Sequence, residues 1–386
     1  MNRTASKYLL LLSVILFASC GHYKIKIKPA ESTKVDLSTA TINVYIENSG
    51  SMDGYVIQGA QFKDDLYSYV SALSSKVGKT NYNYINTQII PVKQADGSFF
   101  QNLSPAAFKA GGGDRQNSEL VDMMRMMLKN ENDNTISVFA SDCILDPTPG
   151  DASKFFYLRQ TDMRNTISSY LAKHKDFGII IFNLESNFDG FMFPVGAPAR
   201  KVTTKRPYYV WVFGPNNLLG ALTKEVPSSY FINGVKHSIS FVKCPNIPFT
   251  VEEPFSEGHL HNNEMNLNSK DRIFHIKADF SSSLLSETYI TNPSNYKQSD
   301  VTIRVEKVDP IKGDDLYTHD MTISYRGTCS HGFYLDLNTV SSWVEAISDD
   351  NGSDIKKTCG IEYIINGIAE AYKETSPLQI DFEIKK

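Results

Sequence analysis

Hydrophobic residues in the first half of the chain follow two patterns that alternate along the sequence. Strand-like runs occupy residues 41–46, 82–92, 135–145, 177–186 and 208–214, and the run 41–46 is nearly continuously apolar or β-branched, as expected for a strand covered on both faces of a sheet. Apolar residues at helical spacing occupy residues 62–77, 117–130, 154–174 and 215–226. This alternation predicts an α/β fold with a doubly wound, mostly parallel sheet and helices on both of its faces.

The pattern changes after about residue 228. Short runs in which apolar and polar residues alternate are separated by polar turns, which predicts antiparallel strands with one solvated face. One stretch with helical spacing, residues 359–374, lies among them. We therefore predict two domains, an α/β domain over residues 40–227 and a smaller, mostly β, sandwich-like domain over residues 228–386.

The first residues have the pattern of an export signal. A short basic region at residues 2–7 precedes an apolar run at residues 8–18, which is too short for a permanent membrane-spanning helix. Cys20 follows closely, so the segment resembles a bacterial lipoprotein signal in which residues 1–19 are removed and Cys20 is lipidated. Phe17 stands where that pattern usually has Leu, and the alternative is a plain secretory signal. Residues 20–39 are predicted to form a tether.

The residues after Cys20 indicate where such a lipoprotein would lie. They are basic and contain no acidic cluster. In lipoproteins of bacteria of the Bacteroidetes type, acidic residues at this point tend to mark export to the cell surface. The resemblance therefore implies an outer-membrane lipoprotein of the cell envelope that faces the periplasm.

Composition narrows the class of protein further. The chain of 386 residues has 41% hydrophobic and 21% charged residues and a net charge of −4, values typical of a folded globular protein. It has no basic excess, which argues against binding to nucleic acid. In an exported protein, three disulfide connectivities are possible for the remaining cysteines, Cys143, Cys244, Cys329 and Cys359. A chain of this length does not need disulfides to be stable.

The main candidate chemistry lies in the stretch ENSGSM at residues 47–52, which ends the first buried strand. Two serines one residue apart can direct both hydroxyls to one point, and Gly50 permits the tight bend between them. The preceding acid adds negative charge. Hard divalent cations prefer oxygen ligands of this kind, so the loop can provide about half of a coordination sphere. The alternative is an ordinary strand-to-helix turn with helix-capping residues.

The stretch INVYIENSGSM resembles the first motif of von Willebrand factor type A domains, in which the first strand ends in Asp-x-Ser-x-Ser and forms a metal-ion-dependent adhesion site. Ser49 and Ser51 match the two serines, and Glu47 stands in place of the aspartate. The stretch ISVFASDCILD resembles a later family motif, with Asp142 as its acid. The resemblance covers about residues 41–226. It implies a bound Mg²⁺, with Mn²⁺ or Ca²⁺ as alternatives.

Two departures from the family pattern affect the predicted site. Glu47 is one methylene longer than aspartate, so its carboxylate can displace a water through which the family's acid often acts. The family's threonine ligand is missing, because Gly113 lies roughly at its position and Asp114 is adjacent. If Asp114 binds instead, the three carboxylates of Glu47, Asp114 and Asp142 hold the ion well but leave it little electrophilicity. If nothing replaces the threonine, the site is metal-free.

These residues favour a binding protein over an enzyme. The predicted function is that of a lipid-anchored envelope protein whose metal edge binds another cell-envelope protein and whose β domain positions that edge. The alternatives are a metal-free scaffold for the assembly of envelope proteins and a serine- or metal-dependent hydrolase. A nucleophilic serine needs a nearby base, and the spacing of the histidines brings none of them to the motif loops.

Overall fold

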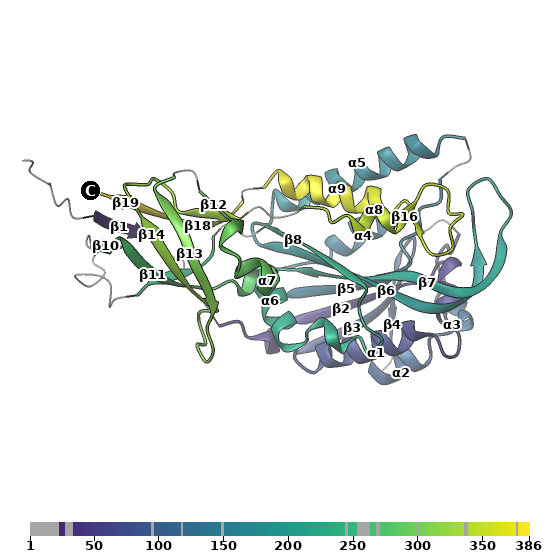
Figure 1. Cartoon of the computed structure of the whole chain (residues 1–386). Coiled ribbons are helices and arrows are strands. Elements are labelled where there is room, and N and C mark those ends of the chain that lie inside the picture. The colour runs from purple at the N-terminus through teal and green to yellow at the C-terminus, as the bar shows by residue number, and fades with distance from the viewer. Residues whose placement is uncertain are drawn as a thin grey trace, which may run out of the picture.

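The structure is a computed structural model that describes residues 23–27, 34–93, 96–116, 119–147, 150–243, 246–252, 263–267, 271–298, 301–335, 339–375 and 377–386. Within these ranges the chain forms an α/β part and a smaller β part, which lie one after the other along the long axis of the molecule (Figure 1). The coarse prediction of an α/β fold is therefore confirmed.

The α/β part is built on a seven-stranded sheet with the strand order β4–β3–β2–β5–β7–β6–β8. The strands are β2 (Thr41–Glu47), β3 (Lys79–Ile85), β4 (Ile89–Val92), β5 (Thr135–Ser141), β6 (Phe177–Met192), β7 (Arg200–Gly214) and β8 (His237–Lys243). Residues of β2 enter the cores on both faces of this sheet, which explains why its sequence is almost continuously apolar.

Only three strands of this sheet run parallel to their neighbours. β2 pairs in parallel with β3 on one side and with β5 on the other, whereas the remaining pairings are antiparallel. The prediction of a mostly parallel sheet is therefore wrong. β6 and β7 are joined by the short segment 193–199, which is too short for the crossover connection that a parallel pair requires.

The apolar run at residues 82–92 forms a hairpin of two strands instead of the one predicted. Asn86 turns the chain, because its N–H donates to the carbonyl of Gln88 at 3.1 Å and its Oδ1 accepts from the Gln88 N–H at 3.3 Å. Asparagine favours turns through bonds of this kind to the backbone two residues on. Pro91 is tolerated in β4 because β4 is an edge strand.

Helices cover both faces of the large sheet, as the sequence predicts. One face packs against α1 (Gln61–Ser74), α2 (Asp96–Gln101), α3 (Pro105–Gly111) and α6 (Asn216–Glu225). The other face packs against α4 (Leu120–Leu128), α5 (Ala152–Leu171) and α9 (Ile361–Lys373). The sheet is therefore the middle layer of three.

β6 and β7 extend beyond the rest of the sheet as a long hairpin, which curves away at the right of Figure 1. Their pairing continues to Met192 and Arg200, whereas β8 follows β6 only as far as Asn183. Near the hairpin tip, the side chains of Phe191 and Phe193 are 53% and 48% exposed. The extension therefore presents apolar surface to solvent.

The β part has its own hydrophobic core and contains antiparallel sheets with the strand orders β13–β14–β11–β9, β10–β1–β19 and β12–β15–β18. The strands are β1 (Tyr23–Ile27), β9 (Phe249–Val251), β10 (Glu264–Leu267), β11 (Ile273–Ala278), β12 (Tyr296–Gln298), β13 (Ile303–Pro310), β14 (His319–Tyr325), β15 (Phe333–Leu335), β18 (Leu378–Ile380) and β19 (Phe382–Lys385). Alternate residues of β11 and β14 are buried, in agreement with the predicted antiparallel strands with one solvated face.

Residues 23–27 correct the predicted tether. They form β1, which pairs with β10 on one side and with β19 on the other. Ile25 and Ile27 are buried, and Lys24 and Lys26 between them are exposed. The alternation of lysine and isoleucine is thus the pattern of a strand with one wet face, and not that of a solvated spacer.

The predicted boundary between residues 227 and 228 does not separate the two parts. β8 belongs to the large sheet, and α9 packs on α5. The α9–α5 contact is close, because a Cβ at Gly367 would lie 2.5 Å from the backbone O of Gln160. The chain therefore enters through the β part, crosses to the α/β part and returns to the β part more than once.

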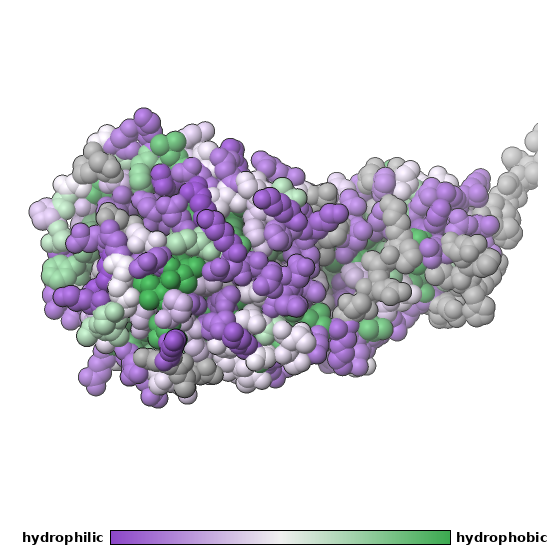
Figure 2. All heavy atoms as spheres, turned by 180° about the vertical axis from the view of Figure 1, so that it is seen from behind, coloured by the Kyte–Doolittle hydropathy of each residue, from purple (hydrophilic) through white to green (hydrophobic). Residues whose placement is uncertain are grey.

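Several features predicted from the sequence lie outside the described residues: the signal peptide 1–19, Cys20 and Cys244. Cys143 and Cys359 are buried free thiols, and Cys329 is also buried. In the described ranges no helix is both long enough and apolar enough to cross a membrane. The face of the molecule opposite to that of Figure 1 is mostly hydrophilic, with small hydrophobic patches (Figure 2).

Glu131, between α4 and β5, gives the stability of the fold a dependence on pH. Its Oε1 accepts a hydrogen bond from the Ser137 hydroxyl, whereas its Oε2 is buried without a hydrogen-bond partner. Burial raises the pKa of this carboxyl to about 8, and the bond from Ser137 opposes the shift. Because the pKa in the folded state is higher than in the unfolded state, protonation of Glu131 favours folding. This contribution is complete below about pH 4 and is lost as the pH rises toward 8.

We predict that Glu131→Gln, which cannot ionise, stabilises the protein relative to the wild type more at pH 8 than at pH 5. The difference in the free energy of unfolding between the two proteins should grow by about 1 kcal/mol or more over this interval. Urea denaturation of both proteins at several pH values measures it. A difference that does not change with pH would show that Glu131 is not buried as described.

Candidate metal-binding site

The predicted site residues of the first motif lie where β2 leaves the sheet. Glu47 is the last residue of β2, and Ser51 begins the 3-10 helix Ser51–Tyr55. Asp142 directly follows β5. Because β2 and β5 are parallel neighbours, the loops that follow them leave the same edge of the sheet. The fold thus brings residues about ninety-five positions apart in the sequence to one edge.

The side chains of the motif loop contact one another and the end of β5. Ser49 Oγ and Ser51 Oγ are 3.0 Å apart. Glu47 reaches the neighbouring strand, where its Oε2 accepts a hydrogen bond from the Ser141 hydroxyl. Ser141 Oγ in turn accepts from the Cys143 N–H at 2.7 Å. The long side chain of Glu47 therefore ties the ends of the two strands together.

Asp142 is only 2% exposed, and half of its carboxylate lacks a partner. Oδ1 accepts from the Ile144 N–H at 3.3 Å, whereas Oδ2 is buried without a hydrogen-bond partner. Burial raises the pKa of Asp142, and the positive charge of Arg206 and the nearby Ser51 hydroxyl act in the opposite direction. A buried carboxylate oxygen is costly unless a cation, a proton or a water satisfies it.

A buried arginine from β7 lies near these acids. Arg206 is 4% exposed, and its guanidinium carbon lies 5.0 Å from the centre of the Phe188 ring. Its Nε and Nη1 atoms are buried and lack hydrogen-bond partners in the part of the chain that the structure describes. Arg206 therefore supplies positive charge to the edge without a hydrogen bond to Asp142.

The glycine-rich loop that follows α3 packs against two asparagines. Gly112 and Gly113 have φ values of 83° and 77°, which favour glycine, and a Cβ at Gly113 would lie 2.1 Å from Asn86 Oδ1. Asn86 Nδ2 donates at 2.9 Å both to Asn48 Oδ1 and to the carbonyl of Gly112. The position at which the sequence lacks a threonine thus has no space for a side chain in this fold.

Asp114 does not join the predicted cluster. Its side chain is exposed, its Oδ1 accepts from the Gln116 N–H at 2.9 Å, and its N–H donates to Thr87 Oγ1 at 3.2 Å. The carboxylates of Glu47, Asp114 and Asp142 are not all within 4.8 Å of one another. The arrangement in which Asp114 replaces the missing threonine, one of the two that the sequence leaves open, is therefore not the one seen among the described residues. The Asp114 carboxylate instead accepts from the backbone of its own turn, whereas the next residue, Arg115, contacts the motif loop.

The residue that fixes the motif loop, Arg115, is not one that the sequence singles out. Arg115 Nε donates to the carbonyl of Asn48 at 2.6 Å, and its Nη2 donates to the carbonyl of Ser49 at 3.1 Å and to the Asp53 carboxylate. The carbonyl of Arg115 accepts from the Gly50 N–H at 3.0 Å. Arg115 follows the glycine-rich loop in the sequence. That position does not reveal which carbonyls its guanidinium reaches.

The β6–β7 hairpin packs against the other side of the motif loop. A Cβ at Gly54 would lie 2.3 Å from the ring of Phe188, so the 3-10 helix and the hairpin touch closely. The Tyr55 hydroxyl donates to the carbonyl of Pro207 at 2.6 Å. The motif loop is therefore held between Arg115 and the hairpin.

The donor atoms at this edge fit a hard divalent cation. They are two hydroxyls, a carboxylate that bridges to β5 and a buried carboxylate oxygen that needs a partner. With both carboxyls ionised, Glu47, Asp142 and Arg206 leave a net charge of −1. A divalent ion would satisfy Asp142 Oδ2 and change the net charge of these groups from −1 to +1.

Comparison of the chain with protein-family models, with curated proteins and with solved structures gives no match. The interpretation of this edge therefore depends on its residues and on their geometry.

We predict that Arg115→Gln lowers the free energy of unfolding by about 2 kcal/mol, because hydrogen bonds from a partly buried charged group to two carbonyls and a carboxylate are lost. Arg125→Gln is the matched control, since the Arg125 side chain is 44% exposed and pairs with Asp122 on the same helix. The control should change stability by about 0.5 kcal/mol or less. Urea denaturation measures both, and equal effects would contradict the role given to Arg115.

Proposed function

We propose that this chain is a lipid-anchored binding protein of the cell envelope, with a von Willebrand factor type A-like α/β part that holds a divalent cation at the edge described above. The observation that carries the proposal is the convergence of Ser49, Ser51 and Asp142 on one edge, where Asp142 Oδ2 is buried without a hydrogen-bond partner. Mg²⁺ is the expected ion, with Mn²⁺ or Ca²⁺ as alternatives. An oxygen atom of a partner protein would complete its coordination.

The charges at the edge support a site that attracts an acidic or carbonyl oxygen. The exposed Asp114 lies outside it, and the buried Arg206 adds positive charge beside Asp142. A divalent ion held by two carboxylates beside an arginine keeps more of its positive charge than one held by three. The site would therefore bind an oxygen ligand more strongly than the sequence alone suggests.

The shape of the molecule supports presentation of this edge to a partner. β1 begins at Tyr23, three residues after Cys20, and lies in the β part. The ends of β2 and β5, helix α3 and the tip of the β6–β7 hairpin lie at the opposite end of the molecule (Figure 1). A lipid on Cys20 would therefore hold the β part at the membrane and direct the candidate site away from it. The exposed Phe191 and Phe193 on the hairpin offer apolar contact beside the site.

The unpartnered N–H groups of Arg206 favour a second candidate, a metal-free scaffold. In that case the buried guanidinium is the counter-charge of Asp142, and no external cation is needed. Such a protein would bind its envelope partner through the hairpin and the loop surfaces alone.

We predict that Mg²⁺ or Mn²⁺ binds the chain without its signal peptide and stabilises it by about 2.7 kcal/mol at a concentration 100 times the Kd. Asp142→Asn and the double variant Ser49→Ala/Ser51→Ala should lose this effect, because they remove ligands from one ion. Asp146→Asn is the matched control, since it makes the same change at an exposed position on the same segment. Isothermal titration calorimetry and thermal unfolding measure binding and stabilisation.

Arg206→Met separates the two candidate functions. If the edge binds a metal, the variant gains net negative charge there, and Mg²⁺ should stabilise it at least as much as the wild type. If Arg206 alone neutralises Asp142, the variant should lose about 3–5 kcal/mol of stability that Mg²⁺ does not restore. The second result, together with the absence of Mg²⁺ binding to the wild type, would rule out the metal site and favour the metal-free scaffold.

A further inference from the structure

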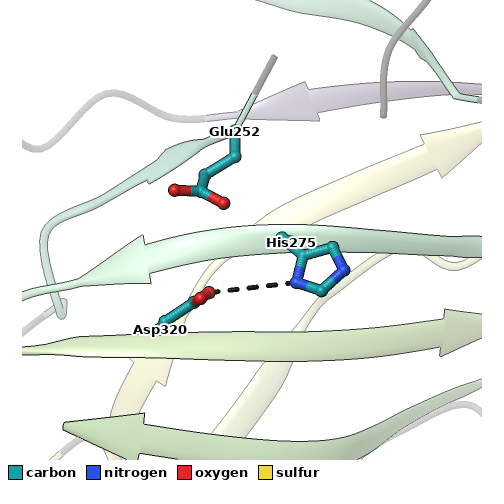
Figure 3. Close-up of side chains that lie close together, drawn as sticks. All are labelled: Glu252, His275 and Asp320. Atoms are coloured by element: carbon teal, nitrogen blue, oxygen red, sulfur yellow. Dashed lines mark ion pairs between the residues drawn. The ribbon is translucent and has the colours of Figure 1, made fainter. Parts of the chain in front are cut away.

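A second cluster of possible metal ligands lies in the β part, on the solvated face of the four-stranded sheet. Glu252 directly follows β9, His275 is on β11 and Asp320 is on β14, and these three strands are neighbours. One ligand atom from each residue lies within 4.8 Å of the other two. Figure 3 shows the carboxylate of Asp320 directed toward the His275 ring, with the side chain of Glu252 nearby.

The strand register explains why these distant residues meet. The Glu252 N–H donates to the carbonyl of His275 at 3.0 Å, which continues the pairing of β9 with β11. His275 stands opposite Thr322 on β14, and Asp320 lies two residues from Thr322 on the same face. Glu252 lies opposite His275, where Cβ atoms are about 4.5–5.5 Å apart, and Asp320 is the diagonal neighbour of His275, at about 7–8 Å, which long side chains can still bridge.

Asp320 brings an oxygen without a hydrogen-bond partner into this cluster. Its Oδ1 is inaccessible to solvent, forms no hydrogen bond in the described part of the chain and lies 3.9 Å from His275 Nδ1. Burial and the charge of Glu252 raise the pKa of Asp320, as expected where carboxylates share a small region. The side chains of His275 and Glu252 are 21% and 25% exposed, so a cation can approach from solvent.

Negative charge exceeds positive charge around the cluster. Lys277 Nζ lies 3.3 Å from Glu252 Oε1 and 3.8 Å from Asp314 Oδ2, and Lys307 Nζ lies 2.7 Å from Asp309 Oδ2. Among the described residues, the charged groups are four carboxylates and two ammonium groups, belonging to Glu252, Asp309, Asp314, Asp320, Lys277 and Lys307. The surplus of two negative charges matches one divalent cation. Lys277 can stay paired with Asp314 when an ion takes Glu252.

We infer that Glu252, His275 and Asp320 bind a divalent transition-metal ion, for which Zn²⁺ is the best match. One imidazole nitrogen and two carboxylate oxygens are a donor set that suits zinc better than Mg²⁺ or Ca²⁺, which take oxygen ligands. Three protein ligands leave one tetrahedral position for a water or for a donor atom of a ligand. The ion would tie the end of β9 to β11 and β14, and it is independent of the proposed function of the α/β part.

The first test is a titration with Zn²⁺ of the chain without its signal peptide. A chelator first removes bound metal, and excess Mg²⁺ is present so that oxygen-only sites are occupied. Glu252→Gln, His275→Gln and Asp320→Asn should each weaken one zinc-binding event by about ten-fold or more, as expected for loss of a ligand. Asp309→Asn is the matched control, because it removes a charge from the same face and is paired with Lys307. The control should change the affinity by less than about three-fold.

The second test locates the bound ion, because other side chains of the chain can also bind zinc. The imidazole resonances of His275 are assigned by their absence in His275→Gln. Zn²⁺ should shift them in the wild type and leave them unchanged in Glu252→Gln/Asp320→Asn, with thermal unfolding showing that the variant is folded. Zinc that leaves His275 unperturbed in the wild type, or that binds all variants equally, would overturn the inference and make the cluster an ion pair of histidine and carboxylates.

Discussion

A carboxylate buried at the edge of a sheet needs a compensating positive charge, and the edge of the α/β part is arranged around this requirement at Asp142. Removing a carboxylate from water costs several kcal/mol even after the protein relaxes. Arg206 from β7 offsets part of this cost through its charge, but no hydrogen bond joins the two groups, and both keep buried atoms without partners. A cation bound by Asp142, Ser51 and Ser49 would satisfy the carboxylate oxygen of Asp142 that Arg206 does not reach.

The surroundings of this carboxylate hold the motif loop in one conformation. Arg115 binds two carbonyls of the loop, and Gly113 packs on Asn86 so closely that no side chain fits there. The β6–β7 hairpin closes the other side through Phe188. Because the hydroxyls are positioned by contacts from three separate segments, little conformational entropy remains to be lost when a ligand binds. The proposed cation site would therefore be preorganised.

Periodicity predicted most helices and strands, because the apolar positions of this chain follow the faces that become buried. It did not predict strand direction, since a strand covered on both faces looks the same in parallel and antiparallel pairs. It also misassigned the Lys–Ile alternation that ends at Ile27, which fits a strand as well as a basic spacer. The position of Asp142 beside the motif loop could be predicted, because the ends of parallel strands meet at one edge of a sheet. Arg206 and His275 could not, since their partners are set by long-range pairings that no local pattern records.

The most direct test of the central claim is a crystal structure of the chain grown with Mn²⁺, with anomalous scattering used to locate the ion. The account predicts an anomalous peak within about 2.0–2.6 Å of Asp142 Oδ2 and of the Ser51 hydroxyl, the range of hard-cation–oxygen distances. A structure with no peak at this edge, in which the Arg206 guanidinium bonds directly to Asp142, would contradict it.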